Sequence, residues 1–223
     1  MEFIVAIDGP AGSGKSTVAK NIARRLEFTY LDTGAMYRAV SLKFLKNGTN
    51  YSDSEELKRE LEDTELDINM GMIYIDGEDV TAEIRKREVT AEVSKVAAIR
   101  EVRKSMVEKQ REIAKGKRII MDGRDIGTTV FPDADVKVFL VATPQERARR
   151  RVKDYEKIGQ KAEFEEILKE INKRDKEDSE REESPLVKAQ DAVEIDTTIM
   201  GIEDVENIIC ELIEKKMIDK IIK

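Results

Sequence analysis

The feature that most constrains this chain is a glycine-rich segment near its start. Residues Gly9 to Ser16 read Gly-Pro-Ala-Gly-Ser-Gly-Lys-Ser and directly follow the apolar run from Phe3 to Asp8. This spacing is that of a phosphate loop, in which successive backbone N–H groups point inward at a polyphosphate. The next residues, Ser16 to Leu26, have apolar side chains at helical spacing, so the loop leads into a helix N-terminus that favours anions. Strand, loop and helix in succession predict an α/β nucleotide-binding fold.

Each part of this loop has an expected task. Lys15 is expected to reach the outer phosphates, and the Ser16 hydroxyl is expected to bind Mg²⁺. The residues expected to hold the phosphates are Gly9, Pro10, Ala11, Gly12, Ser13, Gly14, Lys15, Ser16 and Thr17.

Composition narrows the chemistry. The 223 residues contain no histidine and one cysteine, Cys210, which excludes histidine acid–base catalysis and zinc sites built on histidine or cysteine clusters. Lysine, arginine, carboxylates and Mg²⁺ remain, and phosphoryl transfer needs little else. The net charge of −7 argues against a nucleic-acid partner. With no apolar run of membrane length and no secretory leader, we expect a cytoplasmic protein with no membrane partner.

The pattern along the chain predicts strands alternating with helices. Apolar strand signals at 3–8, 28–32, 118–122, 136–141 and 193–196 indicate a parallel sheet covered on both sides. Short alternating pieces at 65–80, with a turn at Asp76-Gly77, predict a small inserted antiparallel sheet. One long helix is expected from about Thr90 to Lys115. Thr143-Pro144-Gln145-Glu146 has the cap, proline and glutamate of a helix start.

A charged segment, Asp122-Gly123-Arg124-Asp125, follows the strand signal at 118–122. Its side chains are expected at the carboxyl edge of the sheet, where open α/β sheets bind ligands. Asp122 has the position from which such enzymes organise Mg²⁺, directly or through water. The alternative is a turn with an ion pair at the surface.

Four arginines lie within about one and a half helical turns, at 147, 149, 150 and 151. They repel one another unless an anion neutralises them. We interpret them as part of a lid that closes over the transferring phosphoryl group. A solvated basic face is the alternative, and spacing does not say which arginine acts.

The helix expected from Glu163 to about Glu182 changes character along one face. Its apolar stripe is Phe164, Ile167 and Ile171, and the same steps continue to Arg174, Asp178 and Arg181. Because burying these charges without partners is costly, this end is expected to face a charged ligand or a polar cleft. A helix that emerges into solvent after Ile171 is the alternative.

Taken together, the chain resembles the bacterial-type cytidylate kinases, which are nucleoside monophosphate kinases with a P-loop. The resemblance covers nearly the whole length and is carried by residues 7–17, 31–38, 122–132 and 174–186. It implies transfer of the γ-phosphoryl group of ATP to CMP or dCMP. The expected fold is a three-layer α/β/α P-loop fold with a central parallel sheet, a small antiparallel insert in a monophosphate-binding subdomain, and a helical lid.

The resemblance also implies roles at matched positions. The residues expected to act in catalysis are Lys15, Arg124, Arg150 and Arg181. Those expected around CMP are Thr33, Tyr37, Arg38, Ser94, Arg103, Asp122, Gly123, Arg124, Asp125, Arg174, Asp178 and Arg181. Ser16 and Asp122 are expected at Mg²⁺. Arg38 and Arg124 are assigned to the CMP phosphate, which suits the planar guanidinium fork.

Asp125 gives a physical reason for a preference for cytosine. The resemblance implies that Asp125 contacts the cytosine ring. The 4-amino group of cytosine is a hydrogen-bond donor where uracil has a carbonyl, so an ionised Asp125 in that place would accept from CMP and repel UMP. The acceptor phosphate has a second pKa near 6 and is already largely dianionic at neutral pH. No general base is needed.

We expect one kinase domain, monomeric in solution. Its core comprises 1–34, 102–145 and 185–223, the monophosphate-binding subdomain 35–101 with its insert at about 65–80, and the lid with flanking helices about 146–184. One alternative function is phosphorylation of UMP, AMP or dTMP. The other is a P-loop switch that binds a nucleotide without an acceptor.

Overall fold

The computed structural model describes residues 1–69, 71–157 and 159–222. The chain forms two compact units. The first unit comprises Met1–Tyr30 with Ala114–Lys223, and the second comprises Leu31–Ile113. The sequence-based core and subdomain were expected to meet at 34/35 and 101/102, so the second unit begins earlier and also contains most of the helix that precedes Ala114. Each unit is described by itself.

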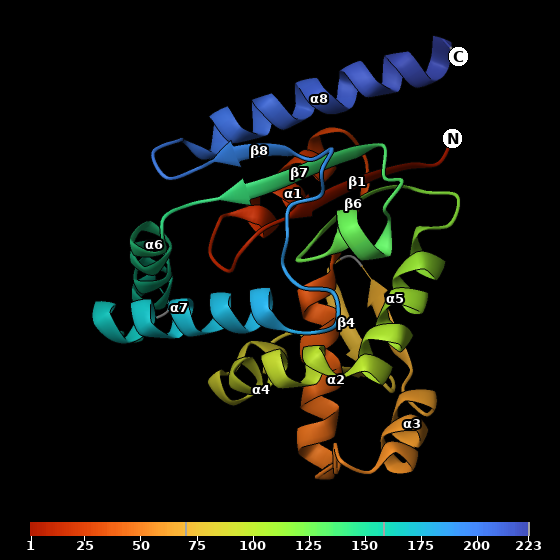
Figure 1. Ribbon diagram of the computed structural model, residues 1–223, viewed down its shortest axis with the longest axis vertical. Helices are drawn as coiled ribbons and strands as arrows, with labels where there is room; N and C mark the ends of the chain where they lie inside the picture. The colour runs from red at the N-terminus through yellow and green to blue at the C-terminus, as the bar shows by residue number, and fades with distance from the viewer. Residues whose placement is uncertain (70, 158, 223) are drawn as a thin grey trace. The chain divides into compact units, whose positions relative to one another are not determined.

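The first unit is built on a five-stranded sheet with the order β2-β6-β1-β7-β8 (Figure 1). The strands of this sheet are β1 (Phe3–Asp8), β2 (Thr29–Asp32), β6 (Arg118–Gly123), β7 (Val136–Val141) and β8 (Val193–Asp196), and the last two residues of β2 belong to the second unit. The pairs β1–β6, β1–β7 and β7–β8 are parallel, with Asp8 opposite Gly123 and Val141 opposite Asp196. The carboxyl ends of these strands therefore meet at one edge, which is where ligands bind in sheets of this type.

Helices α1 (Lys15–Arg25) and α8 (Ile202–Ile222) cover one face of this sheet. Phe3, Val5 and Ile7 of β1 point into the core that these helices complete. The alternate residues Ile4 and Ala6 are buried as well. Burial on both faces explains why the strands read as continuous apolar runs rather than as alternating ones. Cys210 of α8 is buried in the same core.

Two further helices, α6 (Pro144–Lys157) and α7 (Phe164–Glu180), lie side by side in the first unit (Figure 1). They pack through Ala148, Ile167 and Ile171. The predicted start of α6 is confirmed, since the Glu146 N–H donates to Thr143 Oγ1 at 3.3 Å. A short π-helical turn, η2 (Ile126–Val130), follows β6 and contacts β1.

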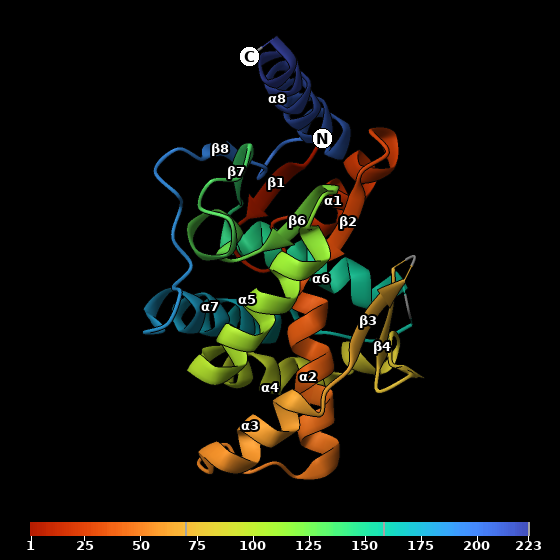
Figure 2. The same cartoon turned by 90° about the vertical axis from the view of Figure 1, so that its right-hand side faces the viewer.

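The second unit contains the predicted antiparallel insert. Its elements are α2 (Thr33–Asn47), α3 (Ser54–Glu62), β3 (Leu66–Asn69), β4 (Met72–Ile75), β5 (Glu78–Asp79), η1 (Glu83–Arg85), α4 (Arg87–Ala98) and α5 (Arg100–Ala114). Strands β3, β4 and β5 pair antiparallel, and Figure 2 shows β4 beside α2. The turn is at Asp76 and Gly77, both with positive φ, as expected for this dipeptide.

The single helix predicted from about Thr90 to Lys115 is wrong. The structure has α4 and α5 in its place, separated by Ile99, whose φ of −75° and ψ of 125° are extended. Val93 and Val96 before the break and Val102 and Met106 after it are all buried. Each helix keeps its own apolar stripe, so the spacing gives no sign of one extended residue between them.

The predicted fold class is otherwise confirmed, with helices on a central parallel sheet and a small antiparallel sheet. Within the described ranges, no helix is long and apolar enough to cross a membrane.

Gly9 is a position where the fold requires glycine. Its φ is +146°, and a Cβ there would lie 2.1 Å from the carbonyl oxygen of Leu140 in β7. Gly48 also has positive φ, +66°, but a Cβ there meets nothing within 4 Å.

We predict that Gly48→Ala lowers the free energy of unfolding by about 1 kcal/mol, from backbone strain alone. Gly9→Ala should cost several-fold more, about 3–5 kcal/mol, because it also forces β1 and β7 apart. Urea denaturation of both variants measures the difference, and equal costs would contradict this account of the loop entry.

Candidate active site

The phosphate loop (Gly9–Ser16) leaves β1 at the carboxyl edge of the sheet and ends on α1. Lys15 is buried there, and its Nζ donates to the Pro10 carbonyl at 2.7 Å and to Ser13 Oγ at 3.4 Å. Burial, followed by repulsion from Arg124, lowers the pKa of Lys15 to about 7. A phosphate placed against this amine favours its charged form. The loop therefore holds the lysine ready for an anion.

Ser16 and Asp122, which were both expected at Mg²⁺, are in direct contact. Ser16 Oγ donates to Asp122 Oδ2 at 2.7 Å, and the Tyr30 hydroxyl donates to Asp122 Oδ1 at 2.8 Å. Two hard oxygen donors beside a phosphate site fit Mg²⁺, which prefers oxygen ligands and usually keeps several waters. The described part of the chain has no group of three or more metal-binding side chains.

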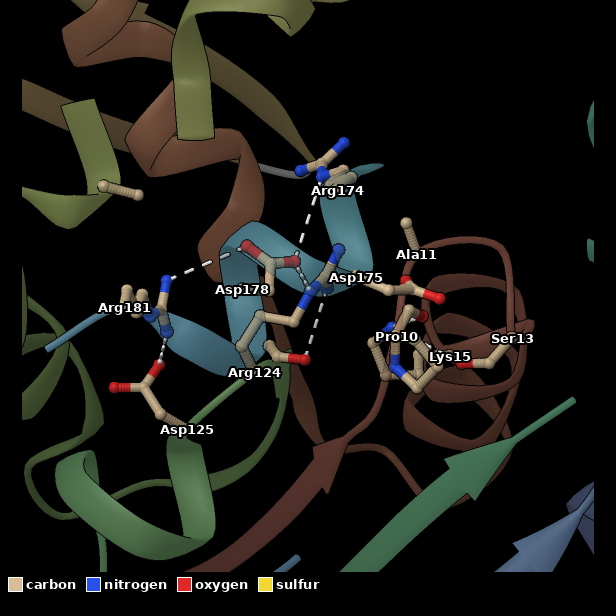
Figure 3. Close-up of polar contacts among 12 residues, drawn as sticks. Pro10, Ala11, Ser13, Lys15, Arg124, Asp125, Arg174, Asp175, Asp178 and Arg181 are labelled. Carbon is tan, nitrogen blue, oxygen red and sulfur yellow. Dashed lines mark hydrogen bonds and ion pairs between the residues drawn. The ribbon is translucent and has the colours of Figure 1, made fainter. Parts of the chain in front are cut away.

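Asp178 gathers three arginines, and Figure 3 shows it between them. Arg124 Nε donates to Asp178 Oδ2 at 2.8 Å. Arg174 Nε lies 3.9 Å from the same oxygen, and Arg181 Nη1 lies 4.0 Å from Oδ1. We call these four residues the Asp178 cluster. Burial of Asp178, which is 5% exposed, opposes its ionisation, but the arginines outweigh burial and hold the pKa of this carboxyl below its usual range.

This arrangement settles the question raised by the stripe on α7. Asp178 is buried and binds Arg124 from the segment after β6, so the prediction that the inward face turns charged is confirmed, and emergence into solvent is wrong for it. Arg181 follows the helix and also lies 3.7 Å from Asp125 Oδ1, while its Nε donates to the Ser184 carbonyl at 2.8 Å. The predicted residues from β6 and α7 are thus brought together.

Asp8, at the end of β1, was not singled out from the sequence. Its carboxylate accepts from the Ile126 N–H at 2.9 Å and from the Gly127 N–H at 2.7 Å. It thereby fixes the η2 turn directly after Asp125. Burial raises the pKa of Asp8 to about 6 even though the two N–H groups oppose that rise.

The four arginines of α6 have different surroundings, which spacing did not reveal. Arg147 is only 3% exposed, and its guanidinium is occupied by protein acceptors. Interpreting it as a lid arginine is therefore wrong. Arg149 is exposed, whereas Arg150 and Arg151 line a cavity beside the phosphate loop.

That cavity has a volume of about 720 Å³. Its walls include residues 12–18 of the phosphate loop and α1, four cationic side chains of α6, and residues 197–202 after β8. Arg150 donates to Thr197 Oγ1 at 3.1 Å, and Thr197 Oγ1 is 3.1 Å from the Ser13 carbonyl oxygen. Sequence reasoning missed Thr197 and its neighbours, although their place after a strand, at the carboxyl edge, was a usable signal.

The second unit carries the remaining predicted residues. Arg38 Nη2 donates to Asp32 Oδ2 at 3.1 Å, and Asp32 also caps α2 by accepting from the Ala35 N–H. The Arg103 guanidinium lies over the Tyr37 ring at 5.4 Å and donates to the Ala97 carbonyl at 3.0 Å. Thr33 begins α2 and is buried, and Ser94 is a half-buried residue of α4.

The family model for cytidylate kinase matches residues 5–215 of this chain. The chain belongs to the cytidylate kinase family. It is 50% identical to the cytidylate kinase of Fusobacterium nucleatum over 213 residues, which is 96% of this chain and 98% of the relative. It is 51% identical to the cytidylate kinase of Clostridioides difficile over 203 residues, which is 91% and 94% of the two chains.

Similar solved structures support the fold of this chain and say nothing about its function. An uncharacterised protein from Eubacterium ventriosum has a TM-score of 0.52 at 15% identity and covers 96% of this chain and 99% of its own. A putative kinase from Chloroflexus aurantiacus has a TM-score of 0.50 at 12% identity, covering 96% and 97%.

The raised pKa of Asp8 makes a prediction about the stability of this cytidylate kinase family member. Between the ordinary pKa of 3.8 and about 6, the folded protein keeps a proton that the unfolded chain releases. Stability contributed by protonated Asp8 is therefore lost as the pH rises through this range, by about 2–3 kcal/mol in total. Asp8→Asn cannot titrate there. Denaturant unfolding at pH 4 to 7.5 should show wild type losing this much relative to Asp8→Asn, and a pH-independent difference would contradict the assignment.

Proposed function

We propose that this chain transfers the γ-phosphoryl group of ATP to CMP or dCMP, giving ADP and CDP or dCDP. The observation that carries this proposal is the placement of two anion-binding groups at one sheet edge of the first unit. The phosphate loop leaves β1 there, and the Asp178 cluster is anchored by Arg124 after β6, the strand next to β1. A donor triphosphate and an acceptor phosphate need two such sites close together.

The donor side is assigned to ATP. The phosphate-loop N–H groups and Lys15 would hold its β- and γ-phosphates. The cavity beside the loop would take the nucleoside, since it is large enough and is walled by residues 197–202 as well as by the loop. Mg²⁺, held by Ser16 and Asp122, would supply positive charge to the phosphates when bound.

The acceptor side is assigned to the arginines. Arg124 Nε donates to Asp178 and its Nη1 lies 3.5 Å from the Gly123 carbonyl oxygen, so the guanidinium has a fixed orientation in which it could bind a phosphate. Arg181 is held by the Ser184 carbonyl and lies beside Asp125. As the acceptor phosphate is already dianionic, these residues have to position it and neutralise charge, without removing a proton. Arg150, fixed to Thr197 at the cavity wall, is assigned to the transferring group.

The roles proposed for residues of the second unit rest on the family resemblance. Thr33, Tyr37, Arg38, Ser94 and Arg103 match the family positions around CMP, and we propose these roles for them. That the protein is a cytoplasmic monomer stays a prediction of the sequence.

Asp125 is proposed to select cytosine. Steady-state assays with CMP, dCMP, UMP, AMP and dTMP at equal concentrations should show CMP or dCMP as the best acceptor. Asp125→Asn should lower kcat/KM for CMP by about 10- to 100-fold and narrow the gap to UMP, since a charged acceptor is lost and the amide offers a donor to uracil. Preference of the wild type for another monophosphate would favour the sibling-kinase alternative. Calorimetry showing ATP binding but no monophosphate binding would favour the switch.

Arg124 is proposed to bind the acceptor phosphate, so Arg124→Ala should lower kcat/KM for CMP by about 100-fold or more. The free energy of unfolding of this variant should fall by much less than the transition-state stabilisation that corresponds to the loss in kcat/KM. Arg118→Ala is the matched control, because Arg118 begins the same strand and donates to the Leu26 carbonyl at 3.1 Å, away from the site. The control should lose stability without losing turnover. Normal kinetics in folded Arg124→Ala would contradict the role.

A further inference from the structure

Arg147 connects three separate segments of the first unit. Its Nε donates to the Ala142 carbonyl after β7 at 2.9 Å, and its Nη1 donates to the Ala11 carbonyl of the phosphate loop at 3.0 Å. Both terminal nitrogens also bind the Asp175 carboxylate of α7, at 3.0 and 2.5 Å. A lysine has a single charged nitrogen and cannot satisfy a carboxylate and two carbonyls in different directions. All three guanidinium nitrogens of Arg147 donate hydrogen bonds.

The phosphate loop packs directly on this arginine. A Cβ at Gly12 would lie 3.2 Å from Arg147 Cβ, so the loop backbone and the first turn of α6 are in close contact. With Arg147 also bonded to the Ala11 carbonyl, the path of the loop depends on where this side chain is held. Because Arg147 is buried behind the loop, it acts on bound phosphates only through the loop.

Asp175 leads from Arg147 to the Asp178 cluster. The two aspartates are three residues apart on α7, and Figure 3 shows their side chains leaving the helix in different directions. Asp175 binds Arg147, while Asp178 binds Arg124. A continuous set of contacts therefore runs from the Ala11 carbonyl through Arg147, Asp175, one turn of helix and Asp178 to Arg124.

Holding α6 against α7 does not by itself require this ion pair. The apolar contact of Ala148, Ile167 and Ile171 already joins the two helices, and buried ion pairs are often no more stabilising than apolar residues of similar size. What the ion pair adds is orientation. Its bidentate geometry fixes the rotation of α7 about its own axis, and this rotation determines where Asp178 points.

We propose that Arg147 and Asp175 are positioning residues that set the phosphate loop and Arg124 in register with each other. This inference rests on the proposed function, in which the loop holds ATP and Arg124 holds the acceptor phosphate. Its distinctive consequence is that one ion pair, which belongs to neither nucleotide site, affects the use of both nucleotides.

The test compares two carboxylates that each join a cation to a backbone segment. Asp175→Asn removes the charge that holds Arg147. Asp135→Asn is the matched control, since Asp135 accepts from the Ile4 N–H at 2.9 Å and from Lys220 at 2.6 Å, at the amino end of β1. For each variant, Tm, kcat and KM for ATP and for CMP are measured, together with calorimetric binding of CMP alone and of ATP alone.

We expect Asp175→Asn to raise KM for both nucleotides and to lower kcat, with a combined loss of about tenfold or more in kcat/KM for each. CMP binding without ATP should weaken as well. Asp135→Asn should lower Tm by less, because Lys220 is more exposed than Arg147, while its kinetic constants stay within about twofold of wild type. If Asp175→Asn changes Tm alone, or changes only the ATP constants, the proposal is overturned.

Arg147→Lys provides a second route if Asp175→Asn does not fold, because it keeps the charge and most of the stem. It should give losses of the same kind. Where both single variants fold, combining Arg147→Lys with Asp175→Asn should add little further loss, as expected for one coupled pair. Additive losses in the double variant would contradict the pair acting as a unit. The same assays separate this inference from the proposed function. If the proposed function is wrong, the wild type does not phosphorylate CMP. If the wild type phosphorylates CMP and the variants do so equally well, only the positioning role of Arg147 and Asp175 is rejected.

Discussion

The interaction on which the site depends is the one between the Asp178 carboxylate and the arginines around it. Three guanidinium groups held close together repel one another, and burial of a carboxylate alone is unfavourable. Together they are stable, because Arg124, Arg174 and Arg181 keep Asp178 ionised and Asp178 keeps the arginines in place. The protein can thereby concentrate positive charge at one point of the sheet edge and still fold.

The sheet determines where that charge lies. Arg124 follows β6, and the phosphate loop follows β1, so the pairing of these two strands sets the distance between the two groups. Asp8 reinforces the arrangement, since it ends β1 and binds the N–H groups of the turn that follows Asp125. The close approach of Gly9 to Leu140 fixes the start of the loop in the same way. Chemistry that relies on positioning and charge rather than on acid–base groups suits such a rigid frame, and it agrees with a chain that has no histidine.

Sequence reasoning was most successful where a local pattern reflects a local cause. The stripe of α7 predicted that Arg174 and Asp178 face inward, because helical spacing alone decides which residues of a helix share a face. It failed where the cause lies far along the chain. The spacing of the α6 arginines does not tell which of them faces a ligand and which faces the interior. Arg147 is buried with Asp175 as its partner, and Asp175 is 28 residues away in the sequence. The break at Ile99 was hidden for a related reason, since apolar side chains on both sides of it are buried.

The sequence by itself determined the phosphate loop, the alternation of strands and helices, the antiparallel insert and the kind of chemistry available. These follow from short-range rules: backbone freedom at glycine, the periods of helix and strand, and the side chains the chain possesses. Only the tertiary structure decided which charged groups face one another. It joined Asp178 to Arg124 and Arg147 to Asp175, and it placed Thr197 beside the loop. Such pairings depend on which strands lie next to each other and on the rotation of each helix, and a buried charge takes whatever partner that packing brings within reach.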